Sequence, residues 1–263
     1  MGRARKYVTV VRAELSSMRQ FALNFAFQSL GLPVAVLVLV YIYRTVSGGG
    51  ALGGYSALQL ALYFVGVAVT SQVCMPAMWT MWESWEQINK GDLANFLCRP
   101  VDYVWFRYAR KLAAVLVTAG CAAVIHVIVR LILGTWAPVA TLQFLLALWL
   151  AFSLWFMWWF LMGAVCFWWE RPFGLRDILW NVVAVLSGQL LPLDLLHPAV
   201  GRLIDWLPFQ GLSFVPASIF TGSLGGGEAW AALGQQAGWL MALTVLARAL
   251  WGLGVRSYDG RGG

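Results

Sequence analysis

The residues best placed for specific polar contacts form one charged segment, residues 83–102, between two long apolar stretches. Its charged side chains include Glu83, Glu86, Lys90 and Arg99. In a chain as apolar as this one, a charged segment exposed to water indicates that a soluble partner acts on it. We therefore expect this segment to make ion pairs and hydrogen bonds with a soluble protein.

The segment is expected to fold as two short helices. Gly91 ends the first helix, over 83–89, and Pro100 ends the second, over 93–98, with Asp92 as its N-terminal cap. The apolar side of the second helix consists of Leu93, Phe96 and Leu97. Helices with one charged and one apolar side suit docking into a groove of a soluble protein. The alternative is an ordinary loop that packs on lipid headgroups.

The sequence contains no established catalytic motif. It has no G-x-x-x-x-G-K-[ST] phosphate loop, no G-x-S-x-G turn and no H-E-x-x-H zinc helix. Its four cysteines and two histidines show no metal-ligand spacing. We therefore expect no catalytic residue, metal ion or cofactor in this chain. The alternative, a membrane-embedded lipid-modifying enzyme or its scaffold, would have to use Asp194, His197, Asp205 and Glu228.

The composition excludes a mainly water-exposed protein. Apolar residues make up 61% of the 263 residues and charged residues only 11%, whereas soluble domains contain about 25% charged residues. A net charge of +7 would suggest nucleic acid in a soluble protein. Here the basic residues flank apolar stretches, so we assign them to orientation in an anionic membrane.

Hydropathy predicts an all-α, polytopic membrane protein that forms a single transmembrane domain over 1–263. The six expected spans are 21–43, 56–80, 107–133, 140–167, 177–193 and 229–251. Residues 5–20 have the period of an amphipathic interfacial helix, although a plain basic flank fits equally well. Prolines and glycines break 194–228, which indicates short or re-entrant helices. The tryptophans of the fourth span fit packing against lipid.

The distribution of basic residues predicts the orientation. With the N-terminus inside, 15 of the 18 lysines and arginines fall in cytoplasmic segments, and Arg44, Arg130 and Arg202 fall outside. The positive-inside rule therefore places both termini and the segment 83–102 in the cytoplasm, and 194–228 on the outer side.

Uncharged polar residues inside the spans are candidates for a transport route. Asn24 and Gln28 share a helix face, because they are four residues apart. The others are Gln59, Gln72, Asn181 and Gln189. Hydrogen bonds between helices would explain any one of them as well. No acidic residue lies deep in a span, so an amphipathic, lipid-like or drug-like cargo fits better than a cation. A secondary carrier or channel would predict charged midplane residues or repeats, and neither is present.

Two motifs resemble a known family. The pattern G-D-L-x-x-x-L-x-R-P-V-D over 91–102 follows an amphipathic acidic stretch, and L-P-F at 207–209 precedes F-V-P-A-S-I-F-T-G at 214–222. Their order, with the length and six spans, resembles the permeases of ABC type-2 exporters, in the branch with compact six-span subunits.

The resemblance implies a role for each part of the chain. The segment 83–102 becomes the coupling segment that contacts an ATP-binding subunit. Its coupling residues would be Glu83, Glu86, Lys90, Gly91, Asp92, Leu93, Arg99 and Pro100. Two permeases, identical or homologous, would pair through spans one, two and five in a bacterial inner membrane. They would bind two ATP-binding subunits, which carry the ATP and Mg²⁺.

Overall fold

The computed structural model describes residues 3–17, 38, 41, 45, 55–169, 172–196, 201, 204 and 206–258. Within these ranges the chain is helical and contains no strand. The α-helices are α1 (Arg3–Ser17), α3 (Ala57–Met78), α4 (Thr80–Asn89), α5 (Asp92–Leu97), α6 (Tyr103–Ile132), α7 (Pro138–Val165), α8 (Phe173–Leu186), α10 (Phe214–Thr221) and α11 (Gly226–Arg256). The short 3₁₀ helices η2 (Leu193–Leu195) and η3 (Pro208–Leu212) precede α10.

Four helical segments of the described chain are long and apolar enough to cross a membrane. They are Ala57–Asn89, Tyr103–Ile132, Pro138–Val165 and Gly226–Arg256. They match the predicted second, third, fourth and sixth spans, so the chain is a multi-pass membrane protein. The third begins at Tyr103 rather than at 107, because Asp102 caps it: its side chain accepts a hydrogen bond from the Trp105 amide at 3.1 Å.

The other two predicted spans have different outcomes. The first, 21–43, lies almost entirely outside the described residues, so the count of six remains a prediction. The fifth, 177–193, corresponds to α8, whose 14 residues reach only about 21 Å, short of the roughly 30 Å hydrocarbon core. The helix ends at Leu186 because Gly188 adopts a left-handed φ of 80° and reverses the chain.

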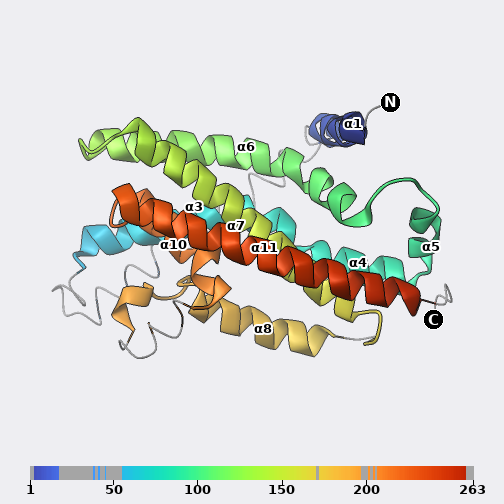
Figure 1. The fold of residues 1–263 in the computed structure, drawn as a ribbon. Coiled ribbons are helices and arrows are strands. Elements are labelled where there is room, and N and C mark those ends of the chain that lie inside the picture. Colours follow the sequence, from blue (N-terminus) through green and yellow to red (C-terminus); the bar gives the residue numbers. More distant parts are fainter. Residues whose placement is uncertain are drawn as a thin grey trace.

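Helix α7 forms the centre of the bundle and contacts α3, α4, α6 and α11 (Figure 1). Its buried face includes the aromatic rings of Phe144, Phe152, Trp155, Phe156, Trp159 and Phe160. The expectation that its tryptophans pack against lipid is wrong for Trp155 and Trp159, which are 1% exposed, whereas Trp149 is 50% exposed. The Trp155 indole donates a hydrogen bond to the Leu212 carbonyl at 3.2 Å, which helps to hold η3 on α7.

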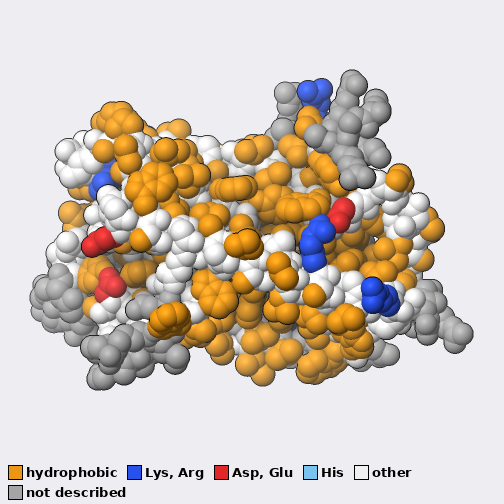
Figure 2. Space-filling model, viewed as in Figure 1, with side chains coloured by type: hydrophobic (Ala, Val, Ile, Leu, Met, Phe, Trp, Pro, Cys, Tyr) orange, Lys and Arg blue, Asp and Glu red, His pale blue; other side chains and the backbone are white. Residues whose placement is uncertain are grey.

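The outer faces of α6 and α11 remain largely uncovered within the chain. Leu116 and Ile132 of α6 and Met241 and Val245 of α11 are among the exposed apolar side chains. In Figure 2, hydrophobic side chains cover most of the visible face and charged ones are few. Such a surface is suited to lipid or to another membrane subunit.

The two ends of the bundle differ in character. At one end lie α5, α1 and the C-terminal end of α11, and at the other lie α10, η2 and η3 (Figure 1). The buried helix α10 packs on α3 where Gly66 allows a close approach, since a Cβ there would lie 3.1 Å from the Ala217 Cα. The expected short helices within 194–228 are therefore present, covered by protein.

Candidate functional site

The charged segment 83–102 continues a membrane helix. Helix α4 follows α3 with only Trp79 between them, and Gly91 then turns the chain with a left-handed φ of 79°. Asp92 is the first residue of α5 and makes no capping hydrogen bond, so the expected cap is wrong in detail. The two short helices and the Gly91 turn are as predicted.

Helix α5 uses its apolar side to bind its own chain. Leu93 and Phe96 are buried, and the Phe96 ring meets those of Tyr103 and Phe106 at 5.0 and 5.1 Å. The expectation that this side faces a partner groove is therefore wrong for these two residues, although Leu97 is exposed. The exposed polar residues of α5 are Asp92 and Asn95, and the Phe96 contacts fix the helix relative to the start of α6.

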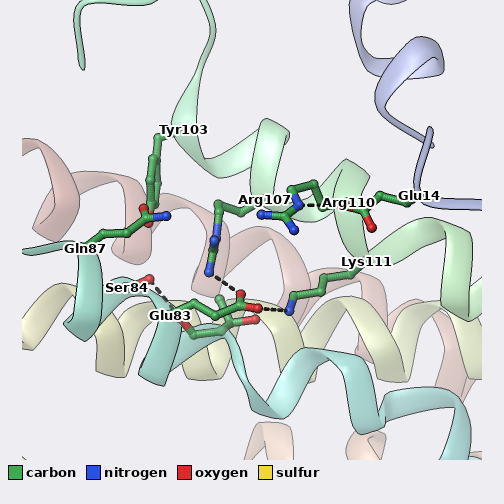
Figure 3. A network of polar contacts seen from close by, with 9 residues as sticks. Glu14, Glu83, Ser84, Gln87, Tyr103, Arg107, Arg110 and Lys111 are labelled. Carbon is green, nitrogen blue, oxygen red and sulfur yellow. Dashed lines mark hydrogen bonds and ion pairs between the residues drawn. The ribbon is translucent and has the colours of Figure 1, made fainter. Parts of the chain in front are cut away.

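Glu83 joins α4 to α6 through two ion pairs (Figure 3). Its Oε1 accepts a hydrogen bond from Lys111 Nζ at 2.7 Å, and its Oε2 accepts one from Arg107 Nη2. The Arg107 side chain is only 3% exposed, while that of Glu83 is 30% exposed. A cation buried this deeply requires a counter-ion. Glu83 is therefore an internal brace between α4 and α6.

Three further polar contacts hold the same end of the bundle together. Arg110 donates to Glu14 of α1 at 2.6 Å, as Figure 3 shows, and Arg248 of α11 donates to Asp102 at 2.9 Å. The Tyr103 hydroxyl donates to Gln87 at 2.7 Å. Sequence reasoning missed all these contacts. The only local signal was the spacing of Arg107 and Lys111, which places both on one face of α6.

The charges that remain accessible lie around the Gly91 turn. Lys90 and Glu86 form an exposed i, i+4 pair at 2.6 Å, and this contact with Glu86 raises the pKa of the Lys90 ammonium. Asp92 is exposed in the first turn of α5. Arg99 follows α5, next to Pro100, with its guanidinium 6.0 Å from the centroid of the Phe96 ring. Acids and bases thus form a mixed polar surface that another protein could recognise.

The predicted substrate-path residues do not share one described site. Asn24 and Gln28 lie outside the described residues. Gln59 is exposed at the start of α3, where it forms a capping box with Ser56. The other three lie at separate places: Gln72 is half-buried on α3, Asn181 is exposed on α8, and Gln189 donates to Ser213 at 3.3 Å.

The alternative acidic set is only partly described. Asp194 accepts a hydrogen bond from the Tyr55 hydroxyl at 2.6 Å, and burial together with this bond raises the pKa of Tyr55. Glu228 is exposed in the first turn of α11, and His197 and Asp205 lie outside the described residues. Among the residues that the structure describes, no three His, Cys, Asp or Glu side chains are grouped to hold a metal ion.

Comparison with known families identifies a match over most of the chain. The family described as ABC-2 family transporter protein matches the chain over residues 31–262. This range includes the charged segment, all four described membrane helices and α10. No curated protein matches the chain.

Proposed function

Because this chain belongs to the ABC-2 transporter family, we propose that it is the permease subunit of an ATP-driven exporter. It is a membrane transport protein rather than an enzyme, and ATP and Mg²⁺ would be bound and consumed by a separate ATP-binding subunit. The observation that carries the proposal is the α4–α5 segment, a polar surface fixed by internal ion pairs to the membrane helices.

The brace suggests how force would pass into the membrane. Helix α4 continues α3, Glu83 ties α4 to α6, and the Phe96 contacts tie α5 to the start of α6. A displacement of α5 by an ATP-binding subunit would therefore move α3 and α6 together. Closure of two ATP-binding subunits would in this way switch the spans between inward and outward arrangements.

We place the α5 end of the bundle in the cytoplasm of a bacterium, with the protein in the inner membrane. The structure groups α1, the Gly91 turn and the end of α11 at that end (Figure 1). The same end carries most of the 15 basic residues assigned to the inside, which favours this orientation. A second permease, identical or homologous, would cover part of the apolar surface. Two ATP-binding subunits would bind at the cytoplasmic end that carries α5.

The cargo we propose is amphipathic, lipid-like or drug-like, moved out of the cytoplasm or the inner leaflet. The walls available to it in the described chain are apolar and aromatic. In the described spans, α3, α6 and α7 contain no acidic side chain, and the acid of α11, Glu228, lies in its first turn. None of them would therefore select a metal or ammonium ion at the midplane.

The test is the double substitution Glu86→Ala/Asp92→Ala in the reconstituted transporter. Both acids are accessible at the Gly91 turn, and neither braces the helices. We expect normal membrane insertion and a loss of transport per ATP hydrolysed. The matched control is Glu228→Ala, an exposed acid at the opposite end of the bundle. Normal coupling in the double variant would overturn the proposal, and a loss of activity in the control would favour the outer acidic site.

A further inference from the structure

A cavity of about 310 Å³ opens between the α3–α4 junction, α7 and α8. Three methionines of α3 and α4 and four tryptophans line it, together with the neighbouring pair Arg176 and Asp177 at the start of α8. Its volume lies at the lower end of the range for ligand pockets, about 300–1,000 Å³. The cavity therefore has room for part of a small amphipathic molecule.

The walls combine a rigid side with an adaptable one. Trp180 of α8 stacks on Trp159 at 5.8 Å, and Trp159 stacks in turn on Trp155 at 6.2 Å, so this side is fixed by the core of α7. Trp79 and Trp82, which also line the cavity, expose large parts of their indoles. Methionine side chains adapt to ligands of different shape because they are unbranched and polarizable. Such walls suit an alkyl chain.

The charged pair gives the cavity one positive and one negative group. Arg176 donates from Nε and Nη2 to Asp177 Oδ1, at 2.9 and 2.7 Å. The two side chains are 38% and 64% exposed. Indole faces also attract alkylammonium groups, such as that of choline. A lipid headgroup with both a phosphate and an ammonium group matches Arg176, Asp177 and the indole faces better than an ion of either sign alone.

The position of the cavity agrees with a headgroup site. Arg176 and Asp177 lie in the first turns of α8, and Trp79 and Trp82 lie about three and two and a half turns before Gly91. Helix α4 and the start of α8 lie in the half of the bundle that carries α5 (Figure 1). Tryptophans concentrate at membrane–water interfaces. Arg176 and Asp177 would therefore contact lipid headgroups, and the methionines would contact the acyl chains.

We propose that this cavity binds a zwitterionic lipid, with its headgroup at Arg176 and Asp177 and its chain among the methionines. Binding follows from the cavity alone. That the bound lipid is cargo entering from the inner leaflet rests on the proposed function. The experiment therefore uses the permease without any ATP-binding subunit, so that its outcome is independent of export.

The probe is a lysophosphatidylcholine with a photoactivatable diazirine on its chain, added to the purified protein in maltoside micelles. Mass spectrometry then maps the adducts. We expect saturable labelling of the peptides that contain Met75–Trp82 and Trp180, displaced by unlabelled lysophosphatidylcholine. Dodecyltrimethylammonium and dodecyl phosphate, each with a single charge, should displace the probe about tenfold less well.

A variant and a control make the test specific. The double substitution Arg176→Gln/Asp177→Asn removes both charges at an exposed place and should reduce labelling about tenfold. Trp149→Leu changes an exposed tryptophan of α7 that does not line the cavity, and it should leave labelling unchanged. Labelling that does not saturate, that survives in the double variant, or that all three amphiphiles displace equally would overturn the proposal.

Discussion

Replacement of Glu83 by Gln tests the brace between α4 and α6 directly. Arg107 and Lys111, with side chains only 3% and 13% exposed, would lose their shared counter-ion. Removing one member of a fully buried pair costs about 3–5 kcal/mol, and an exposed pair contributes about 0–1 kcal/mol. Because Glu83 is 30% exposed, water would compensate in part. We expect a loss of about 2–3 kcal/mol in the free energy of unfolding.

The assay is denaturant unfolding in mixed micelles, followed by tryptophan fluorescence from the buried indoles of α7. The matched control is Glu86→Gln, which breaks an exposed pair on the same helix and should not change stability measurably. A double-mutant cycle with Arg107→Gln isolates the pair, and removing both partners should cost less than the sum of the single losses. Equal stability of the Glu83→Gln and Glu86→Gln variants, or strict additivity in the cycle, would refute the brace.

Two further predictions concern neighbouring contacts. Asp102→Ala removes both the N-terminal cap of α6 and the ion pair with α11, and it should cost about 1–2 kcal/mol in thermal or denaturant unfolding. Asp102→Asn keeps the cap and should lose less than half of that, and equal losses would contradict the capping role. Gly163→Ala should cost about 1–3 kcal/mol, because the added Cβ would lie 2.8 Å from the Ser84 Cβ and push α4 from α7. The control Gly120→Ala meets nothing within 4 Å, so it should be neutral or stabilising, and equal stability of the two variants would contradict this packing.

Local signals in the sequence predicted the elements of the charged segment well. Gly91 was expected to turn the chain, and it adopts the left-handed conformation that favours glycine. Long apolar stretches predicted four of the membrane helices, since twenty or more such residues have few other stable folds. Prolines and glycines predicted short helices around α10. These features depend on neighbours along the chain.

The partners of each side chain could not be predicted in the same way. Glu83 meets residues 24 and 28 positions later in the sequence, and hydropathy does not encode such contacts. The period of α5 showed an apolar side but did not reveal that its own chain covers it. The tryptophans of α7 resembled lipid anchors, because burial in a helix bundle and exposure to lipid select the same apolar residues. The cavity beside α8 likewise depends on four elements that meet only in the fold.

Cross-linking from Cys98 to a co-purified ATP-binding subunit tests the central claim most directly. Cys98 is exposed at the end of α5, beside the proposed docking surface. The permease would be co-expressed with a candidate ATP-binding subunit of an ABC transporter and treated with a short thiol-to-amine reagent. We predict one cross-linked product that depends on nucleotide, disappears with Cys98→Ser and is lost with Glu86→Ala/Asp92→Ala. A complex that forms without any product from Cys98, or the absence of any complex in every nucleotide condition, would contradict the assignment of α4–α5 as the coupling site.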